Sequence, residues 1–132
     1  DAEIAGRLGS VWERVSCRES EVAVGRSHGD WVRWNIGSID GRVTVWDWES
    51  SRTRVPLGFD ALHWWFQNAM AGSGPVAGVG AVRRQRGALG DLGVTHGEED
   101  AVIDAYLVER LAEQVTKLGA VPPPLREAIL SL

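Results

Sequence analysis

The most informative part of the chain reads HGDWVRWN at residues 28–35 and VTVWDWE at residues 43–49. The pair Asp40-Gly41 lies between β-prone runs, and Asp-Gly in that setting predicts a two-residue hairpin turn. We therefore expect a β-hairpin whose two strands are residues 35–39 and residues 42–47.

Three side chains with oxygen atoms flank the expected turn: Asp30, Asn35 and Asp47. A carboxylate held in a loop, such as that of Asp30, can accept a hydrogen bond from a substrate hydroxyl and orient it. Asn35 and Asp47 offer oxygen ligands of the kind that Mg²⁺ takes, usually together with phosphate oxygens. A base, a carboxamide ligand and a carboxylate ligand are the parts used in phosphoryl transfer, where catalysis is mainly positioning and charge neutralisation.

These residues resemble the aminoglycoside phosphotransferase and choline kinase family, relatives of the protein kinases. The shared pattern is H-G-D-x-x-x-x-N, then a hairpin, then an apolar residue followed by D-W-E. The likeness is specific over residues 21–70. It implies that Asp30 is the catalytic base, that Asn35 binds Mg²⁺, and that Asp47 bridges Mg²⁺ to the phosphates of ATP. It also implies ATP and Mg²⁺ as cofactors and a small-molecule hydroxyl as phosphate acceptor.

The same resemblance implies supporting roles for four further residues. His28 and Gly29 belong to the catalytic loop, where the histidine packs and forms hydrogen bonds without transferring protons. Glu49 supports the metal loop. Asp60, in the run VPLGFD at residues 55–60, is expected to hold the catalytic loop by hydrogen bonding to its backbone.

Trp31 and Trp34 occupy positions in the catalytic loop where many members of the family have a His-Pro pair. They pack the loop or face the acceptor pocket, and we take them as candidate acceptor-binding residues. His63 and His96 have no partner at metal-ligand spacing, so we interpret them as a helix-surface residue and a cap-region residue.

The expected fold class is α+β: the mostly helical C-terminal lobe of a protein-kinase-like fold, with a small β-hairpin that carries the metal-binding residues. The lobe spans residues 1–132 and divides into a catalytic loop at 28–35, a metal hairpin at 36–49 and a helical subdomain at 56–132. Apolar spacing predicts an amphipathic helix over residues 3–16.

Local signals place the remaining elements. We expect a short strand at 21–25, a connector at 52–55 and a helix that begins at Pro56 and ends at 72–75. A flexible glycine-rich connection at 72–80 and a broken helical stretch at 81–92 should follow. The last elements expected are a helix from the capping box Thr95–Glu98 to Leu118 and a tail helix at 125–132. The glycine-rich segment lacks the spacing and the lysine of a phosphate-binding loop, so it is not expected to bind nucleotide.

Composition excludes several classes of function. A net charge of −4 gives no sign of a nucleic-acid binder, and a single cysteine, Cys17, excludes an internal disulfide. No run approaches the roughly 20 apolar residues that span a bilayer. Because no signal-peptide pattern begins the sequence, a cytoplasmic location is expected.

The ATP-binding half of the expected enzyme has no counterpart in this sequence. The family's N-terminal lobe covers ATP with a glycine-rich strand pair and supplies a lysine, whereas the single lysine here, Lys117, lies late in the chain. We expect that lobe in a longer parent chain or on another polypeptide. A non-catalytic, kinase-like binding module remains the alternative, and the acceptor remains open among choline, amino sugars, antibiotics, sugars and lipid-linked precursors.

Overall fold

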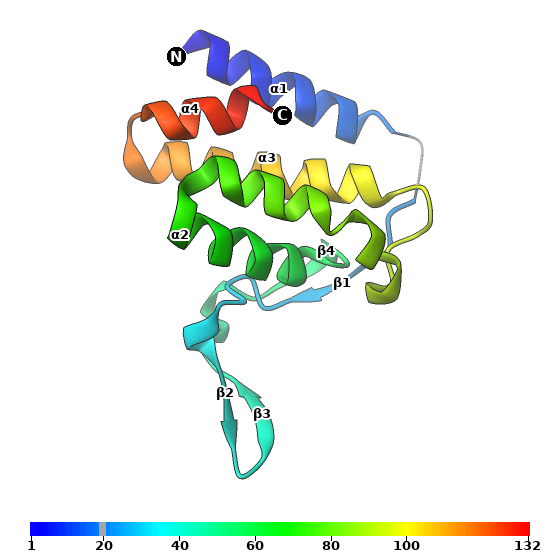
Figure 1. Ribbon diagram of the computed structural model, residues 1–132. Helices are drawn as coiled ribbons and strands as arrows, with labels where there is room; N and C mark the ends of the chain where they lie inside the picture. Colours follow the sequence, from blue (N-terminus) through cyan, green and yellow to red (C-terminus); the bar gives the residue numbers. More distant parts are fainter. Residues whose placement is uncertain (19–20) are drawn as a thin grey trace.

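The computed structural model describes residues 1–18 and 21–132 and shows an α+β fold (Figure 1). The longer helices and the strands are α1 (Ala2–Ser16), β1 (Val24–Ser27), β2 (Ile36–Ile39), β3 (Arg42–Val45), β4 (Arg52–Pro56), α2 (Phe59–Arg84), α3 (Glu99–Leu118) and α4 (Pro123–Leu130). Short 3₁₀ turns lie at Arg33–Asn35, Trp48–Ser50, Arg86–Ala88 and Gly90–Leu92.

The four α-helices pack into one body around a shared hydrophobic core (Figure 1). α3 lies at the centre of this body and buries an apolar stripe that includes Val102, Leu107 and Leu111. Fully burying one such side chain contributes roughly 1.5–3 kcal/mol, so this stripe is a main source of stability. The helix ends at Gly119, whose left-handed backbone (φ 63°) lets its amide donate to the Val115 carbonyl.

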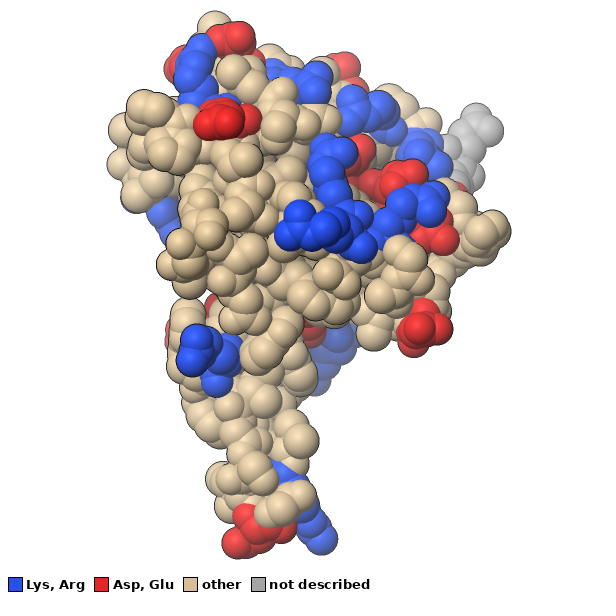
Figure 2. Space-filling model, in the orientation of Figure 1, with Lys and Arg blue, Asp and Glu red and all other residues tan. Residues whose placement is uncertain are grey.

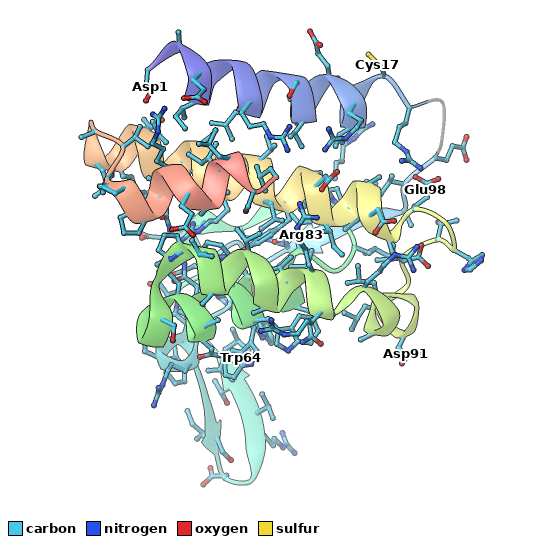
Figure 3. All side chains as sticks on the ribbon, turned by 45° about the horizontal axis from the view of Figure 1, so that its top comes forward. Asp1, Cys17, Trp64, Arg83, Asp91 and Glu98 are labelled. Atoms are coloured by element: carbon cyan, nitrogen blue, oxygen red, sulfur yellow. The ribbon has the colours of Figure 1, made fainter. Side chains whose placement is uncertain are left out.

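The first and last helices, α1 and α4, lie side by side on this body (Figure 1). Arg126 of α4 pairs with the carboxylates of Asp1 and Glu3 at the start of α1. Arg83 of α2 reaches Asp104 of α3 and donates to the carbonyl of Leu132 (Figure 3). These polar contacts lie at the surface, so the buried helix faces account for most of the stability.

Two small antiparallel sheets lie on one side of the helices. β2 and β3 form the expected hairpin, with Ile36 opposite Val45 and Ile39 opposite Arg42. The turn residues Asp40 and Gly41 both have positive φ, 52° and 73°, which is the backbone that an Asp-Gly hairpin turn requires. The predicted turn is therefore confirmed, and the hairpin projects away from the helical body (Figure 1).

The predicted connector at 52–55 is wrong, because these residues form the strand β4. β4 pairs with β1, with Val24 opposite Pro56 and Gly25 opposite Val55. The ladder continues through a hydrogen bond from the Leu57 amide to the Ala23 carbonyl. Pro56 therefore ends a strand and does not open a helix, and the helix begins only at Phe59.

The predicted flexible connection at 72–80 is also wrong, because α2 continues through this segment after a kink. Gly74 has non-helical dihedral angles (φ 80°, ψ −179°) and precedes Pro75, so the helix bends back on itself there. The two limbs lie side by side in Figure 1. A Cβ on Gly78 would come within 2.8 Å of the Phe66 ring, which shows how closely the limbs approach.

The capping box predicted for Thr95 and Glu98 does not form. Glu98 is the residue before α3 and makes no side-chain cap hydrogen bond, while its amide donates to the Thr95 carbonyl in a turn. The Glu99 carboxylate instead accepts a hydrogen bond from the Gly97 amide at 2.8 Å. A carboxylate still lies at the positive end of the helix, supplied by a neighbouring residue.

Candidate active site

The loop that follows β1 is held by the carboxylate of Asp60 in the first turn of α2. Its Oδ2 accepts from the His28 amide at 2.8 Å, and its Oδ1 accepts from the Gly29 amide at 3.0 Å and from the Ser27 hydroxyl at 2.8 Å. The hydrogen bonding expected of Asp60 is thus present. Hydrogen bonds to a charged group contribute about 1.5–3 kcal/mol each, so this carboxylate fixes where the loop starts.

Gly29 permits the loop to approach the 3₁₀ turn at Trp48–Ser50. Its φ is +86°, and a Cβ at this position would lie 2.2 Å from the Ser50 carbonyl oxygen. Only glycine fits both the backbone angle and the contact. The tight loop therefore depends on the glycine of the HGD run.

His28 is fully buried and links the loop to the end of the hairpin. Its Nε2–H donates to the Trp46 carbonyl at 2.8 Å, and its Nδ1 accepts from the Asp30 amide at 3.2 Å. This pair of bonds fits a neutral ring. The ring also lies against Trp48, with centroids 4.6 Å apart, and against Trp31 at 5.8 Å. The packing and hydrogen-bonding role expected for His28 matches these contacts.

Asp30 and Asn35 are directly hydrogen-bonded to each other. The Asn35 amide group donates to Asp30 Oδ2 at 3.1 Å and to the Asp30 backbone carbonyl at 3.0 Å. Asn35 is only 3% exposed, and among the described residues no group donates to its Oδ1. Because both donor bonds use the amide nitrogen, the Asn35 oxygen could serve as a ligand to a cation.

Asp47 lies at the end of the hairpin, one residue beyond a contact with Asn35. The Trp46 amide donates to the Asn35 carbonyl at 3.1 Å, which extends the ladder past Ile36 and Val45. The predicted strand over 42–47 instead ends at Val45, since Asp47 has a left-handed backbone (φ 63°). This conformation breaks the strand alternation next to Asn35 and leaves the Asp47 carboxylate exposed.

The oxygen ligands at this site are few. Over residues 1–18 and 21–132 there is no cluster of three or more His, Cys, Asp or Glu side chains arranged to hold a metal ion. Glu49 is exposed in the Trp48–Ser50 turn. Asn35 and Asp47 alone fit Mg²⁺ only if phosphate oxygens and water complete its octahedral shell, which is the usual arrangement for this ion in nucleotide sites.

His63 is a site residue that the sequence interpretation missed. It was expected on the helix surface but is 3% exposed. Its Nε2 lies 3.3 Å from Asp30 Oδ1 and its Nδ1 lies 3.0 Å from the Tyr106 hydroxyl. Burial, aided by the positive charge of Arg110, lowers the pKa of His63 to about 4, so the ring is neutral at pH 7. Its spacing of three residues from Asp60 on one helix face was the available signal.

A cavity of about 510 Å³ opens beside these residues. One side is formed by the loop and α2, and the other by α3; the lining residues are Ser27, Gly29, Ser50, Arg52, Phe59, Asp60, His63, Tyr106, Glu109, Arg110 and Glu113. The cavity is large enough for a small molecule and combines an aromatic wall with charges of both signs.

The two candidate acceptor-binding tryptophans do not line this cavity. Trp31 is half-buried and lines a separate cavity of about 350 Å³ together with Leu57 and Leu92. Trp34 is 63% exposed. On the visible face of the helical body, acidic and basic side chains lie side by side among a larger uncharged area, and mainly uncharged residues cover the middle of the projecting hairpin (Figure 2).

No protein-family model, curated protein or solved structure matches this chain. Within the described residues, no helix has both the length and the apolar character needed to cross a membrane.

Proposed function

We propose that this chain supplies the catalytic loop and metal ligands of an ATP- and Mg²⁺-dependent phosphotransferase that acts on a small-molecule hydroxyl. The observation that supports it best is the hydrogen bond between Asn35 and Asp30. It holds a carboxylate base and a cation ligand side by side, with the Asn35 oxygen free. The resemblance of the HGDWVRWN and WDWE runs to aminoglycoside phosphotransferases and choline kinases favours the same reaction and a kinase-like C-terminal lobe.

In this reaction Asp30 accepts the proton of the acceptor hydroxyl. The hydroxyl oxygen forms a bond to the terminal phosphorus of ATP, the bond from that phosphorus to the bridging oxygen breaks, and ADP leaves. Asn35 and Asp47 would hold Mg²⁺, which would neutralise phosphate charge when bound. Asp30 has the access that a base needs, because its side chain is 39% exposed although both of its oxygens have donors.

The acceptor binds in the 510 Å³ cavity, because two of its lining residues belong to the site. Gly29 is part of the loop, and His63 is hydrogen-bonded to Asp30. Trp31 and Trp34 lie elsewhere and serve the loop instead. The nucleotide is covered by a lobe outside this sequence, in the parent chain or in trans. Exposed apolar side chains on and around the hairpin, including Trp34, Ile39, Val43 and Trp46, offer that lobe a surface.

The test is transfer of the terminal phosphate of ATP to a panel of amino sugars, choline and simple sugars by the longest natural form of the protein. Asp30→Asn should lower kcat by about 10²–10⁴-fold, the usual contribution of a general base. Asp91→Asn, at an exposed aspartate in the Gly90–Leu92 turn, should leave kcat unchanged.

Equal turnover in Asp30→Asn would overturn the assignment of the base. If the longest natural form neither transfers phosphate nor binds Mg²⁺-ATP in calorimetry, the proposed activity is wrong. A non-catalytic binding module then becomes the better interpretation.

A further inference from the structure

We propose that His63 and Tyr106 are a positioning pair for Asp30: the Tyr106 hydroxyl fixes the tautomer of His63, and the His63 Nε2–H holds one oxygen of the Asp30 carboxylate. The kinetic consequence of this pair rests on the proposed phosphotransferase function. The hydrogen bonds of the pair and the tautomer of His63 do not depend on that function, and they can be tested separately.

The pair connects three elements to one carboxylate. His63 extends from α2, Tyr106 from α3, and Asp30 from the loop after β1, with contacts of 3.0 Å and 3.3 Å along the series. His63 and Tyr106 are both buried, and the Tyr106 ring packs edge-on against Phe59 and Phe66. Because this packing fixes the hydroxyl, the direction of the His63 ring is fixed as well.

The protons in this series have one consistent arrangement. Burial raises the pKa of the Tyr106 hydroxyl far above its ordinary value, so Tyr106 keeps its proton and donates it to His63 Nδ1. A neutral imidazole has one N–H, which must then be on Nε2 and directed at Asp30 Oδ1.

The charges around His63 favour this neutral state. Arg110 on α3 opposes protonation, Asp30 and Asp60 favour it, and burial outweighs both carboxylates. The neutral ring therefore holds Asp30 by a hydrogen bond and not by a full ion pair.

The consequence for Asp30 is a fixed carboxylate plane. His63 engages Oδ1 while Asn35 engages Oδ2, and rotation about the side chain would break one bond or the other. The remaining lone pairs of the carboxylate are therefore held in fixed directions. A residue that holds a general base in one orientation in this way acts as a positioning residue.

The tautomer can be tested in the 132-residue chain by NMR of ¹⁵N-labelled histidine. We expect the His63 signals, assigned by their loss in His63→Gln, to show a single Nε2–H tautomer that does not titrate between pH 5.5 and 8. Tyr106→Phe should release His63 into a mixture of tautomers. An Nδ1–H tautomer, or titration near pH 6.5, would overturn the inference.

The kinetic test uses the longest natural form and compares His63→Leu, which cannot donate, with His63→Gln, whose amide can. Loss of a hydrogen bond to a charged group should lower kcat roughly 10- to 100-fold in His63→Leu, with partial recovery in His63→Gln and an unchanged KM for ATP. Urea unfolding of each variant checks that it folds. The isosteric Tyr106→Phe is a second variant, and its kcat is expected to lie between those of the wild type and His63→Leu.

The outcomes separate the two proposals. Phosphate transfer with equal kcat in the wild type, His63→Leu and Tyr106→Phe would overturn the positioning role while leaving the phosphotransferase intact. If the longest natural form transfers no phosphate but His63 shows the expected tautomer, the proposed function is overturned and the hydrogen-bonded pair stands.

Discussion

His63 links the candidate site to the stability of the protein, because its environment favours the neutral ring. Its pKa is about 4 in the folded chain against an ordinary value of 6.5, owing to burial and Arg110. Between these two pH values the unfolded chain binds more protons, so stability rises with pH. The contribution is fully present above about pH 6.5 and is lost as the pH falls toward 4.

We expect the wild-type free energy of unfolding to fall by about 3 kcal/mol between pH 7 and pH 4 through this group alone. Urea unfolding measured at several pH values should show that decline, and it should be clearly shallower in His63→Gln. His96→Gln, a histidine substitution at a fully exposed position, is the matched control. The same pH slope in wild type and His63→Gln would show that His63 is not held neutral.

The residues of the site differ in how far sequence alone could place them. Asp30, Asn35, Asp47 and Asp60 follow one another in a recognisable order, and local loop geometry brings the first two together. His63 depends on Tyr106, which is 43 residues away and belongs to another helix. No local pattern reports such a partner, so a buried histidine on an apolar helix face was interpreted as a surface residue.

Within the helices, glycines differ in whether their position tolerates a side chain. Gly9 lies inside α1 with no atom near the position of a Cβ, whereas a Cβ on Gly78 of α2 would meet the Phe66 ring. We expect Gly9→Ala to stabilise the protein by about 0.5–1 kcal/mol, because it removes backbone freedom from the unfolded chain. Gly78→Ala should destabilise it by about 1–3 kcal/mol through overpacking.

Urea midpoints of the two variants, measured under the same conditions, check this pair of predictions. Both changes add one methyl group inside a helix, so intrinsic helix propensity favours both equally. A stabilised Gly78→Ala would mean that the limbs of α2 do not approach as closely as the Gly78–Phe66 contact indicates.

The elements predicted correctly are those with a local cause. The hairpin turn follows from the backbone preferences of Asp40-Gly41, and the helix over 3–16 follows from apolar spacing, with α1 observed at Ala2–Ser16. β4 was missed because its partner β1 lies more than 20 residues earlier, so only the fold reveals the pairing. The second limb of α2 was missed because Gly74-Pro75 marks a break, whereas packing on Phe66 restores the helix after it.

At the scale of the molecule, stability and the candidate chemistry are concentrated in different places. The core is formed by the helices with β4, whereas Asp47 lies at the end of a hairpin that has no buried residue in either strand. β1 and β4 differ from that hairpin, because Ser27 and Val55 are buried against the helices. An isolated two-stranded hairpin is marginally stable at best.

We therefore expect the amide protons of β2 and β3 to exchange with solvent through local opening, at a cost of about 0–2 kcal/mol, whereas those of α3 exchange only with global unfolding. Native-state hydrogen exchange in low urea separates these routes, because local opening exposes little surface and its rate hardly depends on urea. β1 and β4 are the matched control and should behave more like α3. Hairpin amides as protected as that of Leu107 would contradict the prediction, since they would require the hairpin to share the stability of the core. If exchange is local, the end of the hairpin next to Asn35 can adjust around a bound cation without unfolding the helices, as the proposed Mg²⁺ site, with two protein ligands, would require.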